Sequence, residues 1–197
     1  KPLGSASLAQ VHRATLLTGE DVAIKVQRPG AQQVMAQDID IMRSIVAQAS
    51  HFVKTDQFID LKGVVEELWQ SFAGAELPRN LDEFHRLHED DGAISCPRSY
   101  LAYCTEHIVV MDYVDGISIA DPERLVEAGY DLEKVGSSIV DDYATQVLQD
   151  GFFHADPHAG NIIVRDGIVY FIDMGMVGRM SSHDRGIVKD MIYAVAT

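Results

Sequence analysis

The chain has 197 residues, of which 47% are hydrophobic and 23% are charged. This length suits one domain with a buried core or two small lobes around a cleft, and the composition excludes collagen-like, mucin-like and disordered chains. Sixteen Lys and Arg residues against thirty Asp and Glu residues give a net charge of −14, which argues against a nucleic-acid binder. A nucleotide held by a few local cations and Mg²⁺ is not excluded.

The two cysteines, Cys96 and Cys104, show neither metal-ligand spacing nor a disulfide framework. This favours unpaired, buried thiols in a reducing compartment, and we expect a cytoplasmic protein. No apolar run reaches the roughly 20 residues that a membrane-spanning helix needs. The chain begins at Lys1 without an initiating Met and stops within a predicted helix, so we expect it to be truncated at both ends.

Hydrophobic periodicity predicts the elements of the first half of the chain. Val22, Ile24 and Val26 alternate with Ala23 and Lys25, which is typical of a strand. Apolar residues at three- and four-residue spacing indicate helices, and the Gly and Pro residues of 73–78 break them. The expected elements are strands at 10–16 and 22–27 and helices at about 31–50, 57–72 and 80–88.

Sequence patterns in the second half of the chain predict short strands and two well-marked helices. An amphipathic pattern of Leu132, Val135, Ile139, Tyr143 and Val147 indicates a helix that Gly151 ends. A capping box over 181–184 starts a terminal helix. The expected elements are strands at about 99–103 and 107–112, a helix at about 131–150, a hairpin with strands at 162–164 and 168–172, and the terminal helix. Strands come first and helices last, with a thin connection near 113–117, so we expect an α+β chain with two lobes.

The hairpin places chemistry-bearing residues together. Asp166-Gly167 between two apolar runs is a strong hairpin signal, and with these two residues as the loop, Asn161 lies opposite Ile172. Asp173 is the next residue, so Asn161 and Asp173 emerge at the same end of the hairpin. An amide oxygen and a carboxylate that converge in this way suit Mg²⁺, which completes its shell with phosphate and water.

Asp156 lies five residues before Asn161, in a loop that contains Pro157 and Gly160. It can face the same opening as a base or an orienting carboxylate. The spacing is the His-x-Asp-x-x-x-x-Asn … Asp-x-Gly arrangement of phosphoryl transferases built on the protein-kinase plan. His154, Asp156 and His158 also allow a transition-metal site, but no further Cys or His cluster supports it, so oxygen-ligated Mg²⁺ is favoured and His154 is expected to organise the loop.

A nucleotide-holding lobe is expected upstream of this loop. Val22-Ala23-Ile24-Lys25 matches a strand-borne lysine that pairs with phosphates, and the small residues from Gly4 to Gln10 precede a strand, as a phosphate-covering loop must. Each signal alone is weak, because such a strand is more often an edge strand with a solvated lysine. Because the two signals occur together, in this order and before a predicted catalytic loop, a nucleotide-binding lobe is the favoured interpretation.

With these motifs in view, the chain resembles the UbiB/AarF-domain atypical kinases, which are linked to ubiquinone biosynthesis. The resemblance spans nearly the whole chain. It lies in the stretch 2–12, similar to the family's alanine-rich loop, in 22–30, similar to its lysine strand, in 109–116, similar to its hinge, in 151–161, similar to its catalytic loop, and in 172–175, similar to its metal-binding turn.

The resemblance implies a protein-kinase-like two-lobed α+β fold, with a small, mostly β N-lobe with inserted helices at 1–114, a hinge near 111–116 and a mostly helical C-lobe at 115–197. It implies ATP and Mg²⁺ as cofactors, with Asp156 and Lys25 catalytic and Asn161 and Asp173 on the metal. The residues expected at the nucleotide are Gly4, Ser5, Ala6, Ser7, Ala9, Lys25, Glu76, Met111, Asp112, Tyr113 and Val114. A lipid or isoprenoid-quinone-related ligand, and membrane association through segments outside this chain, are further expectations.

One stretch departs from the family pattern. The family carries a Glu-x-Asp pair and then Glu-Ala-x-Asn on the helix whose glutamate meets the strand lysine, whereas 71–80 here is several residues short and has Pro78 in place of Ala. Glu76 is one candidate partner for Lys25, Glu66 and Glu67 are alternatives, and absence of this ion pair is a further alternative. Two rival functions stay open: a small-molecule phosphotransferase similar to aminoglycoside or choline kinases, and a nucleotide-binding pseudokinase that acts as a conformational switch.

Overall fold

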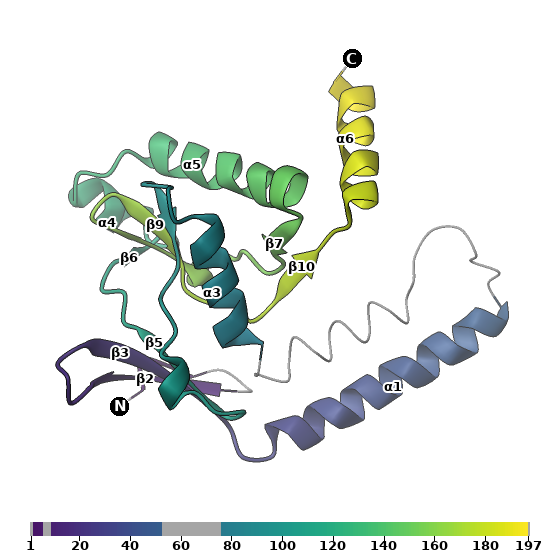
Figure 1. Ribbon diagram of the computed structural model, residues 1–197, viewed down its shortest axis with the longest axis horizontal. Helices are drawn as coiled ribbons and strands as arrows, with labels where there is room; N and C mark the ends of the chain where they lie inside the picture. Colours follow the sequence, from purple (N-terminus) through teal and green to yellow (C-terminus); the bar gives the residue numbers. More distant parts are fainter. Residues whose placement is uncertain (1, 6–8, 53–75, 197) are drawn as a thin grey trace. The chain divides into compact units, whose positions relative to one another are not determined.

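The computed structural model describes residues 2–5, 9–52 and 76–196 (Figure 1). The helix predicted at 57–72 and the residues Ala6 and Ser7 lie outside these ranges. The chain forms two compact units, one of residues 1–78 and 100–111 and the other of residues 79–99 and 112–197. The lobe boundary after residue 114 stays a prediction.

The first unit is built on a four-stranded sheet. Its order is β1 (Gly4–Ser5), β2 (Ala9–Thr15), β3 (Asp21–Gln27) and β5 (Ile108–Asp112). β2 and β3 form an antiparallel hairpin, whose turn closes with a 2.8 Å hydrogen bond from Leu16 N–H to Glu20 O. Both strands and the strand predicted at 107–112 are confirmed.

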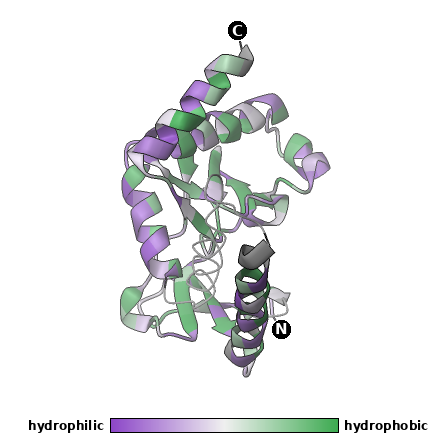
Figure 2. Cartoon of the chain, turned by 90° about the vertical axis from the view of Figure 1, so that its right-hand side faces the viewer, coloured by the Kyte–Doolittle hydropathy of each residue, from purple (hydrophilic) through white to green (hydrophobic). Residues whose placement is uncertain are grey.

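The helix predicted at 31–50 is confirmed as α1 (Ala31–Phe52). Figure 2 shows hydrophobic and hydrophilic residues alternating along it. Ile39 is buried, whereas Met42 and Ile45, three and six residues further along the helix, are 41% and 62% exposed. The apolar periodicity therefore predicted the helix but not which of its apolar side chains are buried.

The strand predicted at 99–103 is wrong. Leu101–Tyr103 forms a short 3-10 helix, because Tyr103 N–H and Cys104 N–H bond back to the carbonyls of Tyr100 and Leu101. Thr105 then turns the chain toward β5, its hydroxyl accepting the N–H groups of 107 and 108. Both cysteines are unpaired as expected, with Cys96 buried and Cys104 partly exposed.

The second unit contains a four-stranded sheet, a two-stranded ribbon and most of the helices. The sheet order is β4 (Ile94–Ser95), β9 (Ile168–Phe171), β8 (Ile162–Arg165) and β6 (Ile117–Ser118), and the ribbon pairs β7 (Phe152–His154) with β10 (Val177–Arg179). The helices are α3 (Leu77–Leu87), which begins at the junction of the units, α4 (Pro122–Glu127), α5 (Leu132–Thr145) and α6 (Ser182–Ala196), with a π-helical turn at Gln146–Asp150 and a 3-10 turn at Ala159–Asn161.

The predicted hairpin is confirmed in register. Ile162 pairs with Phe171 and Arg165 with Ile168, which leaves Asp166 and Gly167 as the two loop residues. Both have positive φ angles, 52° and 82°, as a two-residue turn of this kind requires.

The core of the second unit lies between α3, α5 and the sheet. Phe84 of α3 and Phe171 of β9 are fully buried, with ring centroids 5.5 Å apart, and α5 contacts β4 and β9. The predicted helix ends are confirmed: Gly151 ends the helical stretch with a φ of 69°, and Ser181 and Asp184 form the reciprocal capping box of α6.

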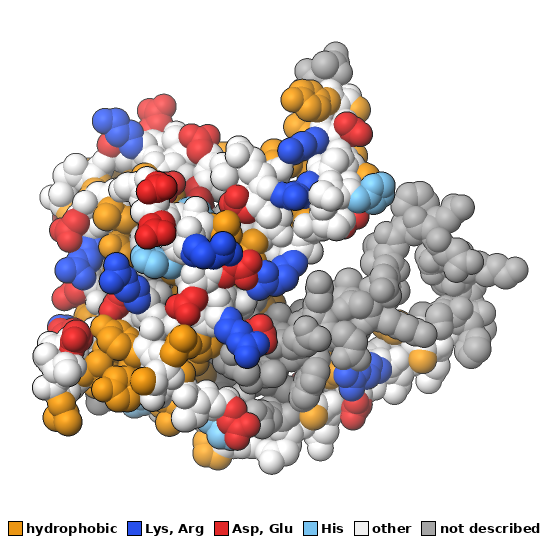
Figure 3. Space-filling model, viewed as in Figure 1, with side chains coloured by type: hydrophobic (Ala, Val, Ile, Leu, Met, Phe, Trp, Pro, Cys, Tyr) orange, Lys and Arg blue, Asp and Glu red, His pale blue; other side chains and the backbone are white. Residues whose placement is uncertain are grey.

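The surface of the second unit mixes charges of both signs, with Lys and Arg side chains next to Asp and Glu side chains on the face seen in Figure 3. Exposed hydrophobic side chains gather on α6, where Ile187, Met191 and Tyr193 are each at least 47% exposed. Within the residues described, no helix combines the length and the hydropathy needed to cross a membrane.

Candidate active site

The two candidate metal ligands lie at the end of the β8–β9 hairpin. Ile172 N–H donates a 2.9 Å hydrogen bond to Asn161 O, one step beyond the last strand pair, and Asp173 follows directly. The hairpin therefore brings both residues to the same end, as the sequence predicts, while their binding of a metal stays a prediction.

Local hydrogen bonds orient both side chains. The Asn161 Nδ2 group donates to Asp156 O at 3.2 Å, which holds the side-chain amide and makes its oxygen the candidate metal donor. Asp173 Oδ1 accepts the Gly175 N–H at 3.0 Å. Both side chains are half-buried. An amide oxygen and a carboxylate are hard donors, so this donor set fits Mg²⁺ rather than a softer transition metal.

The loop that carries Asp156 is held by histidines at both ends. Asp156 N–H donates to His154 Nδ1 at 3.1 Å, and Gly160 N–H donates to His158 Nδ1 at 3.1 Å. His154 is 1% exposed, and burial lowers its pKa, although the charges of Asp173 and Asp156 oppose the shift. A neutral ring that accepts at Nδ1 fits this environment, and the expectation that His154 organises the loop is confirmed.

The same bonds weigh against a transition-metal site at His154, Asp156 and His158, because both Nδ1 atoms are engaged by backbone N–H groups. Among the residues that the structure describes, no three His, Cys, Asp or Glu side chains form a group that could hold a metal ion.

The turn after Asp173 is tied to α3. Asn80 is 2% exposed, and its Nδ2 group donates to Met174 O at 2.9 Å. Arg179, on β10, forms a two-point ion pair with Glu83 at 2.7 and 3.0 Å and lies over the Phe152 ring. One helix therefore supports both the segment after Asp173 and the ribbon that precedes Asp156.

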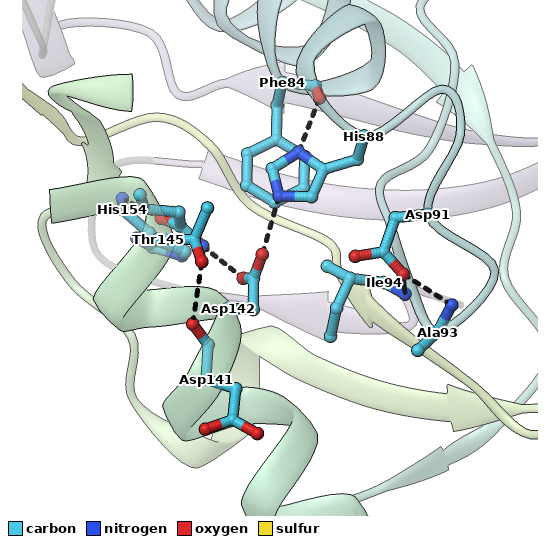
Figure 4. A network of polar contacts seen from close by, with 10 residues as sticks. Phe84, His88, Asp91, Ala93, Ile94, Asp141, Asp142, Thr145 and His154 are labelled. Carbon is cyan, nitrogen blue, oxygen red and sulfur yellow. Dashed lines mark hydrogen bonds and ion pairs between the residues drawn. The ribbon is translucent and has the colours of Figure 1, made fainter. Parts of the chain in front are cut away.

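A second support, which we term the buried polar chain, consists of His88, Asp142, Gln146 and His154. Figure 4 labels His88, Asp142 and His154 of this chain. His88 Nε2 lies 2.6 Å from Asp142 Oδ1, and Gln146 Nε2 donates to Asp142 Oδ2 at 2.5 Å. Gln146 Oε1 then accepts the backbone N–H of His154 at 2.9 Å. All four residues are at most 7% exposed.

His88 stacks on Phe84 at 4.0 Å between ring centroids, and its Nδ1 lies 2.8 Å from Phe84 O. Burial lowers the pKa of His88, but the hydrogen bonds to Asp142 and Phe84 O and the Asp142 charge outweigh burial, so the pKa is raised. The Phe84 carbonyl can only accept, so Nδ1 carries a proton, and the raised pKa favours a second proton on Nε2, which faces the Asp142 carboxyl group.

The residues expected at the nucleotide lie mostly in the first unit. Gly4 and Ser5 form β1 opposite Val11 and Gln10. Lys25 is half-buried in β3, Ala9 begins β2, and Glu76 directly precedes α3. Met111 is buried in β5, Asp112 ends that strand, and Tyr113 and Val114 follow it. A Lys25–Glu76 ion pair and a shared cleft with Asn161 and Asp173 stay predictions.

Comparison with known proteins decides the family. The model of the ABC1 atypical kinase-like domain matches residues 1–197, the whole chain. The chain belongs to this family.

Curated relatives of this chain support its membership of the family. It is 39% identical over 200 residues to an uncharacterized protein in the hydrogenase 1 5′ region of Clostridium pasteurianum, covering 99% of this chain and 37% of that protein. It is 35% identical to ACTIVITY OF BC1 COMPLEX KINASE 7, chloroplastic, of Arabidopsis thaliana, covering 99% and 29% of the two chains. It is 33% identical to "Probable protein kinase UbiB" of Azotobacter vinelandii, covering 98% and 38%. The chain therefore spans about a third of the length of these relatives.

Among solved structures, Rv3197 of Mycobacterium tuberculosis, determined with erythromycin, matches with a TM-score of 0.67 at 24% identity, covering 91% of this chain and 46% of that one. At this identity the match shows the fold alone. The resemblance inferred from the motifs and the α+β kinase-like fold class are both confirmed.

Sequence reasoning missed the residues that support the site. His88, Asp142 and Gln146 carry no motif, and the amphipathic pattern of 131–150 assigns the inner face to apolar residues. Asn80 lies in the stretch that corresponds to the family's Glu-Ala-x-Asn, for which the sequence analysis considers only the glutamate. That asparagine was the one sequence signal that could have identified a residue supporting the site.

Proposed function

We propose that this chain is the nucleotide-binding and catalytic core of an ATP- and Mg²⁺-dependent atypical kinase or ATPase of the UbiB type. One observation carries the proposal: the ordered loop from His154 to Asn161 is joined by a hairpin to Asp173. In this arrangement the Asp156 carboxylate lies five residues before Asn161. The Asn161 amide and the Asp173 carboxylate lie at the same end of the hairpin. Membership of the ABC1 family supports it.

Each residue then has a chemical role. Asp156, whose side chain is 48% exposed, orients the attacking hydroxyl or water. Asn161 and Asp173 would hold Mg²⁺, which neutralises phosphate charge when bound. Lys25 pairs with the α- and β-phosphates, so that positioning and charge neutralisation supply most of the catalysis.

The remaining nucleotide contacts come from the other expected residues. Backbone N–H groups of the small-residue loop, Gly4 to Ser7 and Ala9, would cover the phosphates, and Glu76 would hold Lys25 in place. Met111, Asp112, Tyr113 and Val114 would line the adenine pocket. The strand positions of Lys25 and Met111 support these assignments.

The wider role is inferred from relatives. The similarity to the UbiB protein of Azotobacter vinelandii supports a role in ubiquinone or other isoprenoid-lipid metabolism, with a lipid or quinone-related ligand. We place the protein in the cytoplasm, in association with a membrane through segments outside this chain.

Metal-dependent nucleotide binding tests the site. In a titration of the natural, full-length protein with a fluorescent ATP analogue, Asp173→Asn should abolish the Mg²⁺-dependent part of the affinity. Asp166→Asn is the matched control, because Asp166 lies on the same hairpin, is 81% exposed and has a positive φ that Asn tolerates. Retained Mg²⁺-dependent affinity in Asp173→Asn would defeat the assignment.

Turnover distinguishes an enzyme from a switch. Wild-type protein should hydrolyse ATP or transfer its phosphate, and Asp156→Asn should lose turnover while it still binds Mg²⁺ and nucleotide. Binding without any turnover in the wild type would instead identify a nucleotide-dependent pseudokinase.

A further inference from the structure

The buried polar chain ends on the catalytic loop, not on another part of the core. Its last member, His154, receives a hydrogen bond from Asp156 N–H, and Asp156 is the proposed orienting carboxylate. Hydrogen bonds therefore run without a break from Phe84 O, through His88, Asp142 and Gln146, to Asp156.

Each bond in this chain fixes the direction of the next. Asp142 can only accept, so it selects the orientation in which Gln146 presents its NH₂ group to the carboxylate and its oxygen to the His154 N–H. A rotated Gln146 amide would bring two oxygens together and leave two donors facing each other. His88 binds the other oxygen of Asp142 and so holds the carboxylate in place.

The backbone of His154 is held on both sides from the same helical stretch. Gln146 accepts its N–H at 2.9 Å, and the Tyr143 hydroxyl donates to its carbonyl at 2.9 Å. With both backbone groups fixed, the ring of His154 is placed to accept the Asp156 N–H. A π-helical turn begins at Gln146, and such turns are frequent at functional sites.

We propose that Gln146 and Tyr143, with Gln146 oriented by the His88–Asp142 ion pair, are positioning residues that hold the segment 154–156 in the shape that catalysis requires. This inference rests on the role of Asp156 in the proposed function. It predicts a loss of turnover without a loss of nucleotide binding, because none of these four side chains is expected to contact the nucleotide.

The first test replaces Gln146 with a residue of similar size. In the full-length protein, Gln146→Met should lower kcat by about 10- to 100-fold, as a loop misplaced by roughly an ångström does, with the nucleotide Kd within about twofold of wild type. Gln149→Met is the matched control on the same turn, because Gln149 is exposed and lies outside the chain of bonds, and it should leave kcat unchanged. Unchanged kcat in folded Gln146→Met, or an equal loss of kcat and nucleotide affinity, would overturn the proposal.

Substitutions of Asp142 separate orientation of Gln146 from a purely structural role, because Asn keeps the hydrogen bonds and Leu does not. Asn at this position can donate to an unprotonated His88 Nε2 and accept from Gln146, so every bond survives with a neutral histidine. Asp142→Asn should keep kcat within about threefold of wild type, whereas Asp142→Leu should lose as much as Gln146→Met. An equal loss of kcat in Asp142→Asn and Asp142→Leu would contradict orientation of Gln146 as the cause. Should the buried variants fail to fold, Tyr143→Phe removes only one hydroxyl and should still lower kcat at unchanged Kd; unchanged kcat would refute the inference.

Hydrogen exchange separates this inference from the proposed function. The amides of His154 and Asp156 should exchange about tenfold faster in Gln146→Met than in wild type, and at the wild-type rate in Asp142→Asn and Gln149→Met. This measurement needs no turnover. Absence of ATP turnover in wild type would defeat the proposed function alone, whereas unchanged exchange in Gln146→Met would defeat the positioning role even in an active enzyme.

Discussion

The His88–Asp142 pair gives the sharpest prediction for stability. Both side chains are at most 5% exposed, and their closest atoms are 2.6 Å apart. Replacing His88 with Leu leaves the Asp142 carboxylate buried, with the Gln146 amide still donating to it, and removal of one partner from such a pair costs about 3–5 kcal/mol. At roughly 3 °C per kcal/mol for a chain of this size, the unfolding midpoint should fall by roughly 10 °C.

Asp142→Asn should cost far less, about 1 kcal/mol, because the hydrogen bonds persist and only the charge assistance is lost. The assay is thermal or urea unfolding of the two variants beside wild type at the same pH. Wild-type stability in His88→Leu, or equal losses in the two variants, would refute the reasoning.

The same pair predicts a pH dependence with a definite sign. The pKa of His88 is raised in the folded protein, so its stabilisation is complete below the ordinary histidine pKa of about 6.5 and is lost as pH rises through the folded value. Asp150, the other charged group acting on His88, has a pKa that burial raises. The lowered pKa of His154 has the opposite sign, since it removes stability as pH falls below about 6.5.

Because the His154 contribution is common to wild type and Asp142→Asn, subtracting the two stability curves isolates the pair. The free-energy difference should be largest in mildly acidic solution and shrink as pH rises through the folded pKa of His88. An alkaline loss of stability of the same size in Asp142→Asn would show that His88 is not its source.

Three further predictions concern glycines, a helix cap and the cysteines. Gly116→Ala should destabilise the protein by at least about 2 kcal/mol, because a Cβ there would lie 2.4 Å from a β8 side chain and 2.6 Å from a β8 carbonyl. Gly136→Ala, in α5 with nothing within 4 Å, should instead stabilise it by about 0.5–1 kcal/mol. Urea titration of both variants measures the contrast. Ser181→Ala should cost about 1 kcal/mol by removing the cap of α6, seen as a lower helix content and midpoint in circular dichroism. Iodoacetamide at pH 8 should alkylate Cys104 well before Cys96, because burial raises the pKa of Cys96 to about 12, and mass spectrometry of the two peptides would show the reverse if Cys96 were accessible.

Sequence reasoning was most accurate where one local rule fixes the geometry. Asp166-Gly167 determines the hairpin turn, and the turn determines the register that places Asn161 opposite Ile172. The cap of α6 and the glycine stop at 151 likewise depend on a few neighbouring residues. The segment 99–103 failed because its apolar and aromatic residues suit a strand or a helix equally, and backbone bonds among 100–104 decide for the 3-10 turn.

The support of the candidate site could not be predicted in this way, since it depends on pairs far apart in the chain. His88 and Asp142 are separated by 54 residues, and Asn80 and Met174 by 94. In α5 the periodicity pointed to Leu132, which is 41% exposed, while Asp142 is buried at 7%. A buried carboxylate is costly unless it is paired, so its pairing partner must be present for the helix to turn this face inward.

This cost also explains why the network is informative about function. An apolar residue at Asp142 would avoid the desolvation of a carboxylate and of the histidine that neutralises it. It could not, however, dictate which end of the Gln146 amide faces the His154 N–H. Directional control of one backbone group, two residues before Asp156, is what the polar residues supply and apolar packing cannot.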